Sequence, residues 1–148
     1  MPRISIIIPA FNEEASIAQV LAAIPANLAD EVIVVDNNST DATAKIATSF
    51  AFVTLVREKK QGIIQARNRG FNEAECELIA RIDADTKLPN VWVENVHKLC
   101  DKHANEVFGA SGPAYLHHTN SKRVGKAVGR LLVEEGFFKG TKLMLGHE

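Results

Sequence analysis

Short apolar runs alternate with amphipathic segments along the first hundred residues of the chain. Four of these runs are rich in β-branched and aliphatic residues, and we predict them to be strands: 4–8, 31–35, 52–56 and 78–82. Their apolar character is nearly continuous, which is typical of strands buried on both faces of a parallel sheet. Pro9 follows the first run, so we expect the first strand to end there.

The segments between these runs carry apolar side chains at helical spacing. We therefore predict helices over 13–24, 42–50, 61–74 and 91–100. Asn12 stands where it could cap the first helix, whose first turn would then contain Glu13 and Glu14. The apolar stripe that includes Trp92 in the last helix is expected to belong to the core rather than to a sugar-binding surface.

Two further elements are predicted in the last third of the chain. Residues 106–115 are expected to form a fifth strand, bulged or at the sheet edge because of its glycines and proline. Residues 120–138 have the pattern of a basic, amphipathic helix that packs within the protein or forms a homodimer contact, with contact to a membrane surface left open. Since no segment resembles a linker or a repeat, we expect residues 1–148 to form a single domain, truncated or minimal.

Strands that alternate with helices predict right-handed crossovers and an α/β fold, with a mostly parallel sheet covered on both faces. In such sheets, ligands bind beyond the carboxyl ends of the strands. Acids, amides, hydroxyl groups and bases follow the four predicted strands: Asn12 and Glu13, 36–40, 57–60, and Asp83 with Asp85. We therefore expect one polar site at this edge of the sheet.

The amino-acid composition of the chain limits the classes of function that need to be considered. With 148 residues, of which 46% are hydrophobic and 24% charged, the chain has the make-up of an ordinary globular domain. A net charge of -1 gives no general reason to expect nucleic acid as a partner. Cys76 and Cys100 match no metal-ligand spacing and are too few for a disulfide framework. Neither a signal-peptide pattern nor a membrane-length apolar span occurs, so we expect a cytoplasmic location.

Asp83 and Asp85 form the most distinctive chemical feature of the sequence. In an extended chain their carboxylates would point to the same side and repel each other by roughly 1 kcal/mol in water. A hard divalent cation would relieve this repulsion. The alternative for an isolated D-x-D sequence is an acidic turn without function.

The residues after the first two predicted strands lack a glycine-rich loop but include polar groups that could bind a nucleotide in another way. No G-x-G-x-x-G or G-x-x-x-x-G-K-[ST] motif follows the first strand, which removes the main support for a dinucleotide-dependent dehydrogenase or a P-loop protein. Asp36 could accept hydrogen bonds from a hydroxyl or ring N–H group of a ligand. Arg67 could add a cation to the same site.

Four motifs, in order, resemble the N-terminal, nucleotide-sugar-binding part of a family 2 glycosyltransferase with the GT-A fold. They are Ile6 to Glu14, Val34 to Asp41, Gly62 with Ala66 to Gly70, and Asp83 to Asp85, and they cover about residues 3–90. The resemblance implies a three-layer α/β/α fold that is incomplete at the C-terminus. It also implies the following site: Pro9, Ala10 and Phe11 border the nucleobase, Glu13 and Asp36 hold the nucleoside, Arg67 helps to fix it, Asp83 meets the ribose or the metal, and Asp85 ligates Mg²⁺ or Mn²⁺.

The implied reaction is transfer of a sugar from a UDP- or GDP-sugar to an acceptor hydroxyl, with inversion. The resemblance points to a glycan or lipid-linked acceptor, to cell-envelope polysaccharide or glycolipid synthesis, and to a site at the inner face of the membrane. No catalytic base is assigned, because Glu134 and Glu135 are expected on a solvated helix face. A ligand role for His117 and His118 is not expected, since adjacent strand residues face opposite sides.

Two other hypotheses remain open from the sequence. One is a nucleotide-sugar-binding fragment or inactive homologue that lacks the base and the acceptor site. The other is a non-catalytic interaction domain, which predicts no metal-dependent nucleotide binding.

Overall fold

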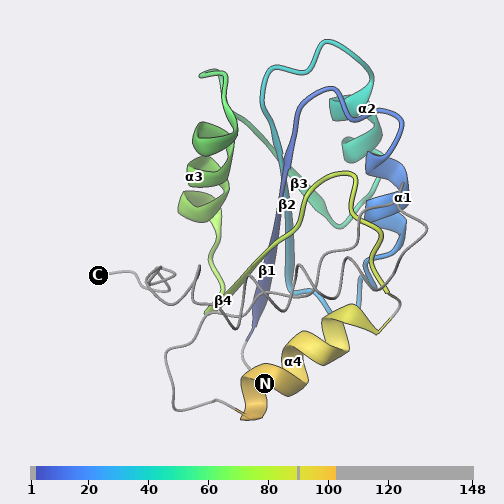
Figure 1. The fold of residues 1–148 in the computed structure, drawn as a ribbon, viewed down its shortest axis with the longest axis vertical. Coiled ribbons are helices and arrows are strands. Elements are labelled where there is room, and N and C mark those ends of the chain that lie inside the picture. Colours follow the sequence, from blue (N-terminus) through green and yellow to red (C-terminus); the bar gives the residue numbers. More distant parts are fainter. Residues whose placement is uncertain (1–2, 90, 103–148) are drawn as a thin grey trace, which may run out of the picture. The chain divides into compact units, whose positions relative to one another are not determined.

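The structure, a computed structural model, describes residues 3–89 and 91–102. Within these ranges strands and helices alternate as predicted (Figure 1). The strands are Ile4–Ala10 (β1), Glu31–Asp36 (β2), Val53–Arg57 (β3) and Leu78–Arg81 (β4), and the helices are Ile17–Ala22 (α1), Thr43–Thr48 (α2), Ile63–Glu73 (α3) and Trp92–Lys102 (α4). The predicted strand 106–115 and helix 120–138 lie outside the described residues.

The four strands form one parallel sheet in the order β3-β2-β1-β4. Strand β1 is central and pairs with β2 through Ile6↔Val32 and with β4 through Ile6↔Ala80. All seven residues of β1 are buried, as its continuous apolar pattern predicts for a parallel strand covered on both faces.

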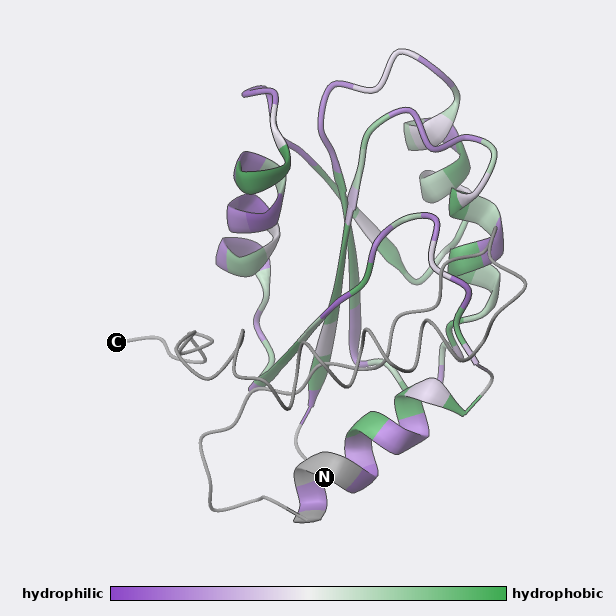
Figure 2. Ribbon diagram, in the orientation of Figure 1, coloured by the Kyte–Doolittle hydropathy of each residue, from purple (hydrophilic) through white to green (hydrophobic). Residues whose placement is uncertain are grey.

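Helices cover both faces of the sheet and give three layers, with α3 on one face and α1 and α2 on the other (Figure 1). Alternate residues of β1 point to opposite faces. Ile6 and Ile8 pack with residues of α1, α2 and α4, whereas Ile7 packs with residues of α3. Hydrophobic residues are concentrated in the strands and hydrophilic ones in the loops beyond their carboxyl ends (Figure 2). The predicted α/β fold is therefore confirmed, as is the core position of Trp92, which packs against the larger cluster.

Helix α3 lies very close to the sheet because Gly70 faces it. A Cβ atom at Gly70 would lie 2.9 Å from Cγ2 of Ile7 and 3.2 Å from Cγ2 of Val35. Arg67 is less than one turn away on the same helix, so this close contact also sets the position of the Arg67 side chain.

The prediction that the first strand ends at Pro9 was wrong, because β1 continues to Ala10. Pro9 pairs in register with Val35 of β2. The carbonyl of Ile7 accepts a hydrogen bond from the β4 side, so Pro9, two residues later, also turns its nitrogen towards that side. Strand β4 has already ended there, and the missing N–H group of proline costs no hydrogen bond between strands.

The predicted start of the first helix was also wrong. Helix α1 begins at Ile17, and Asn12 does not cap it. Asn12 has a φ of 54°, and its Oδ1 accepts the N–H group of Thr40 at 2.8 Å, in the loop after β2. The side chain thus joins two loops instead of closing its own helix.

No helix within residues 3–89 and 91–102 is both long and apolar enough to cross a membrane. The prediction that residues 1–148 form a single domain stays a prediction.

Candidate functional site

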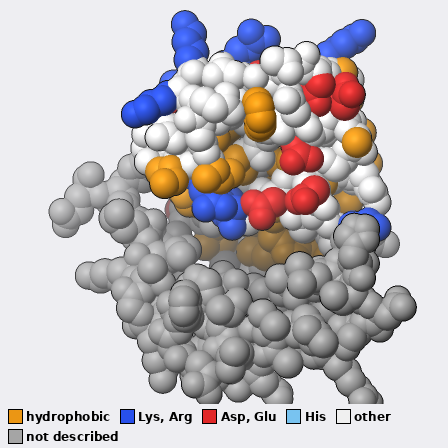
Figure 3. Space-filling view, turned by 45° about the horizontal axis from the view of Figure 1, so that its top comes forward, with side chains coloured by type: hydrophobic (Ala, Val, Ile, Leu, Met, Phe, Trp, Pro, Cys, Tyr) orange, Lys and Arg blue, Asp and Glu red, His pale blue; other side chains and the backbone are white. Residues whose placement is uncertain are grey.

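A cleft of about 460 Å³ opens at the carboxyl ends of the strands. Its walls come from the loop after β1, the beginning of α3 and the turn after β4. The lining residues are Pro9, Ala10, Phe11, Glu13, Asn37, Gln61, Gly62, Ile63, Ala66, Arg67, Asp83, Ala84 and Asp85. Figure 3 shows a basic group beside acidic groups on the described surface, with hydrophobic side chains next to them. The structure thus brings seven of the eight predicted site residues together, and only Asp36 is not in the lining.

Asp83 and Asp85 lie in a turn rather than in an extended strand. The turn is closed by a hydrogen bond of 3.0 Å from the N–H group of Thr86 to the carbonyl of Asp83. Ala84 is buried, whereas both carboxylate residues are exposed and line the cleft. The prediction that the two carboxylates point to the same side because the chain is extended was therefore wrong, although both residues line the same cleft. Arg81 donates a hydrogen bond of 2.5 Å to Oδ1 of Asp83 and offsets part of its charge.

Arg67 lines the cleft from α3 and carries an unsatisfied polar group. Its Nε atom is buried and has no hydrogen-bond partner among the described residues. Leaving such a donor unpaired costs about 1–3 kcal/mol, or more for a charged group. By contrast, Arg69 on the same helix forms an ion pair of 2.9 Å with Glu73. Arg67 is therefore suited to an anionic or hydrogen-bond-accepting ligand.

Asn37 was not assigned a role from the sequence, but it holds one wall of the cleft. Its buried side chain donates to the carbonyls of Glu58 at 3.0 Å and Lys60 at 2.8 Å, and its Oδ1 accepts the N–H group of Gly62 at 2.8 Å. All three partners belong to the loop between β3 and α3. Because they lie more than twenty residues away in sequence, only the fold reveals the role of this asparagine.

Asp36 is buried at the end of β2, with a relative exposure of 5%. Its Oδ1 accepts the N–H group of Ser39 at 3.1 Å, which shapes the first residues of the following loop. Its expected contact with a nucleoside stays a prediction.

The loop after β1, which brings Phe11 and Glu13 to the cleft, is fastened to the loop after β2. The N–H group of Asn12 donates to Oγ of Ser39 at 3.1 Å, and the Asn12 side chain accepts from Thr40. Phe11 itself is 48% exposed at the rim of the cleft.

Comparison with known proteins identifies the family. The family model for glycosyl transferase family 2 matches residues 5–147, which is nearly the whole chain. The chain belongs to glycosyltransferase family 2. An uncharacterized glycosyltransferase of Mycobacterium tuberculosis is 37% identical over 126 residues, which cover 84% of this chain and 56% of that protein. The glycosyltransferase AglE of Haloferax volcanii is 33% identical over 103 residues, covering 64% of this chain and 34% of AglE.

Solved structures of glycosyltransferases share the fold of this family 2 chain. Staphylococcus aureus TarS aligns with a TM-score of 0.64 at 23% identity over 79% of this chain and 40% of TarS, which concerns the fold alone. Mycobacterium tuberculosis glucosyl-3-phosphoglycerate synthase in complex with UDP aligns with a TM-score of 0.57 at 28% identity, over 71% of this chain and 41% of the synthase. The fold is therefore GT-A. The chain spans about half of the length of the mycobacterial relative and less of the others.

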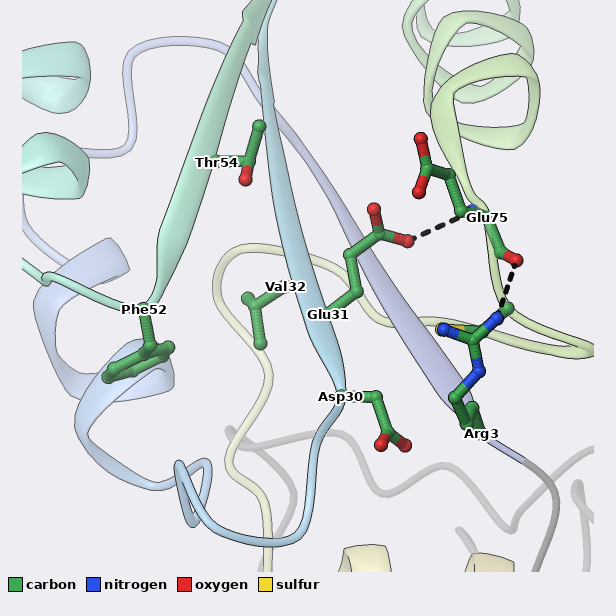
Figure 4. Close-up of a pocket in the computed structure, with 8 residues that line it drawn as sticks. Arg3, Asp30, Glu31, Val32, Phe52, Thr54 and Glu75 are labelled. Atoms are coloured by element: carbon green, nitrogen blue, oxygen red, sulfur yellow. Dashed lines mark hydrogen bonds between the residues drawn. The ribbon is translucent and has the colours of Figure 1, made fainter.

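A second depression, of about 250 Å³, lies at the amino end of the sheet (Figure 4). Several of its polar groups join the segment before β4 to the rest of this family 2 fold. Glu31 accepts the hydroxyl of Ser5 and, at 3.1 Å, the N–H group of Glu75, while Arg3 donates to the carbonyl of Glu75 at 3.5 Å. This depression lies away from the carboxyl ends of the strands, and we assign it a structural role.

Proposed function

We propose that the cleft binds a nucleotide-diphosphate sugar together with a divalent cation, and that the protein transfers the sugar to an acceptor hydroxyl with inversion. The observation that carries this proposal is the meeting of Asp83, Asp85 and Arg67 in one cleft of a family 2 chain, with no partner for the Arg67 Nε atom among the residues that the structure describes. A diphosphate presents oxygen atoms both to a guanidinium and to a carboxylate-bound cation, so one ligand would satisfy all three groups.

Asp83 and Asp85 would hold Mg²⁺ or Mn²⁺. Two exposed carboxylates supply the hard oxygen ligands that these ions prefer. No group of three or more His, Cys, Asp or Glu side chains within residues 3–89 and 91–102 is arranged to hold a metal ion. The remaining ligands would then come from the diphosphate and from water. A bound cation would stabilise the negative charge that develops on the departing diphosphate.

The other lining residues would bind and orient the donor. Pro9, Ala10 and Phe11 would border the nucleobase, and Glu13 with Asp36 would hold the nucleoside. Support for UDP comes from the mycobacterial synthase, whose structures include one in complex with UDP and one with Mn²⁺, UDP-glucose and glycerol 3-phosphate. The latter is 30% identical over 63% of this chain.

The acceptor side is proposed from the family alone. We propose a glycan or lipid-linked acceptor, in keeping with a relative named dolichol-phosphate mannosyltransferase from Pyrococcus furiosus, which is 29% identical over 121 residues. A role in cell-envelope polysaccharide or glycolipid synthesis at the inner face of the membrane is part of the same proposal. Membrane or dimer contact through 120–138, and any base role of Glu134 or Glu135, concern residues outside the described ranges.

Isothermal titration and product analysis with a panel of UDP- and GDP-sugars test this proposal. We expect at least one UDP-sugar to bind in the presence of Mn²⁺ and to bind at least about tenfold more weakly after EDTA treatment. Release of free sugar or transfer to an acceptor supports the enzyme, whereas binding without turnover supports the nucleotide-sugar-binding fragment. Failure of every nucleotide to bind at millimolar concentration would refute both.

A further inference from the structure

The cleft residues Phe11 and Glu13 lie in the β1–α1 loop, which is hydrogen-bonded to the β2–α2 loop as well as to the beginning of α1. Helix α1 begins only at Ile17, and neither α1 nor α2 has a side-chain hydrogen bond from its own N-cap residue. The N–H groups at the start of a helix need acceptors from elsewhere. Here the N–H group of Ala42, the N-cap residue of α2, finds its acceptor in Glu14 of the other loop at 2.9 Å.

Thr43, the first residue of α2, provides the central contact. Its side chain is fully buried, and its Oγ1 accepts the N–H group of Glu13 at 2.8 Å. The same hydroxyl donates to Oδ1 of Asp41 at 2.5 Å. A hydroxyl that both donates and accepts in a buried place has a single orientation, so Asp41 fixes the lone pair that Thr43 presents to Glu13.

Asp41 and Glu14 exchange hydrogen bonds between the two loops. Oδ2 of Asp41 accepts the N–H group of Glu14 at 3.1 Å, and in return Oε2 of Glu14 accepts the N–H group of Ala42 at 2.9 Å. Each carboxylate therefore satisfies a backbone donor of the other loop: Glu14 lies three residues before α1, and Ala42 is the N-cap residue of α2. The backbone on both sides of Glu13 is held by residues of the β2–α2 loop.

We infer that Thr43, oriented by Asp41, is a positioning residue that fixes Glu13 and the neighbouring Phe11 for binding of the nucleoside part of the donor. The inference rests on the proposed function of the cleft. The Glu13 carboxylate itself accepts a hydrogen bond from the Ser16 hydroxyl at 2.6 Å, and a shift of the Glu13 backbone would disturb this contact. Thr43 does not line the cleft itself and acts through its hydrogen bond to the backbone of Glu13.

Replacement of Thr43 by valine and by serine tests the inference. Thr43→Val keeps the branched shape but removes the hydroxyl, whereas Thr43→Ser keeps the hydroxyl. Thr48→Val is the matched control, because the exposed Thr48 hydroxyl bonds only to carbonyls of its own helix. We expect Thr43→Val to weaken Mn²⁺-dependent UDP binding about 5- to 10-fold, at a temperature where circular dichroism shows each variant folded. Thr43→Ser and Thr48→Val should bind within about twofold of the wild type.

Amide hydrogen exchange at Glu13 gives a readout that does not need the nucleotide. Exchange should accelerate about tenfold in Thr43→Val and remain unchanged in Thr43→Ser and Thr48→Val. Should Thr43→Val not fold, Asp41→Asn at its half-buried position serves as the second variant, with the same expected direction in both measurements.

The two measurements separate the possible failures. Unchanged UDP binding in folded Thr43→Val overturns the positioning role and leaves the proposed function intact. Unchanged exchange at Glu13 also overturns it. If the wild type binds neither UDP nor GDP, the proposed function fails. A response of Glu13 exchange to the loss of the hydroxyl would then still support the contact, but not its role in donor binding.

Discussion

Arg67 shows how a single residue can indicate the ligand of a site. Its Nε atom lies buried next to the cleft without a partner among the described residues, although its neighbour Arg69 is paired with Glu73. A buried guanidinium N–H group normally has an acceptor, since an unpaired one is costly. We propose that a bound donor would supply this partner, because phosphate oxygens can accept two hydrogen bonds from one guanidinium.

Arg67→Met is therefore expected to weaken nucleotide binding without loss of the fold. A hydrogen bond to a charged group contributes about 1.5–3 kcal/mol, which corresponds to a loss of roughly 10- to 100-fold in affinity for UDP with Mn²⁺. Arg69→Met is the control, because it removes the same charge from an exposed ion pair on the same helix. Equal affinities of the two variants would show that Arg67 does not contact the nucleotide.

At the scale of the elements, Gly70 couples the packing of α3 to the geometry of the cleft. In most helices, replacing glycine by alanine stabilises by about 0.5–1 kcal/mol. At Gly70 the new methyl group would lie 2.9 Å from Ile7 Cγ2, closer than side-chain carbon atoms approach. Helix α3 would have to move away from the sheet and would carry Arg67 with it.

Gly70→Ala should lower the free energy of unfolding by about 1–3 kcal/mol, which is the usual cost of overpacking. Urea denaturation measures this change, and UDP titration of the folded variant should show weaker binding. Asn72→Ala, at an exposed position of the same helix, should instead be neutral or slightly stabilising. A higher free energy of unfolding for Gly70→Ala than for the wild type would mean that α3 can move away from the sheet without loss of stability.

The hydrogen bonds that carboxylates accept from backbone N–H groups also predict a dependence of stability on pH. Partial desolvation alone would raise the pKa of Asp41, but hydrogen bonds from Thr43 and Glu14 outweigh it and hold the pKa below its ordinary value. The pKa of Glu77 is lowered in the same way, by its own backbone N–H group and that of Arg3. For a carboxyl whose pKa is lowered by folding, the contribution to stability is complete above the unfolded-state pKa, about 4, and is lost as the pH falls through the folded-state value.

Stability should therefore decline as the pH is lowered from 5 towards 3, and part of this decline should disappear in Asp41→Asn. Urea denaturation at a series of pH values measures both curves. Glu77→Gln should remove a second part of the decline in stability, and this part should be independent of Asp41 because Glu77 lies at the opposite end of the sheet. Parallel curves for the wild type and Asp41→Asn would contradict a lowered pKa of Asp41.

The elements also show which parts of the structure can be predicted from the sequence. Continuous β-branched runs place the strands because burial on both faces requires apolar residues at every position, as in Ile6, Ile7 and Ile8. Asn12 was misassigned because local cap rules consider only nearby backbone groups, whereas its partner Thr40 is in another loop. The role of Asn37 in shaping the cleft was not predicted for the same reason, because its partners are in the loop between β3 and α3. The non-local hydrogen bonds that shape the cleft follow from the fold and not from local patterns.

At the scale of the whole molecule, the described residues form the GT-A half that would hold the donor. A cleft at the carboxyl ends of parallel strands follows from the topology, so the positions of Asp83, Asp85 and Glu13 could be predicted without knowledge of their exact geometry. The acceptor site and the catalytic base could not be predicted, because Glu134 and Glu135, the adjacent acids late in the sequence, are expected on a solvated helix face. The chain also spans only about half of the mycobacterial relative.

A crystal structure of the protein soaked with UDP and Mn²⁺ would show directly whether the cleft binds the nucleotide and the metal ion. We predict that the diphosphate lies between Arg67 and a cation held by Asp83 and Asp85, and that the uracil ring lies beside Phe11. A nucleotide bound elsewhere, for example in the depression near Glu31, or a cation that contacts neither aspartate, would contradict the account.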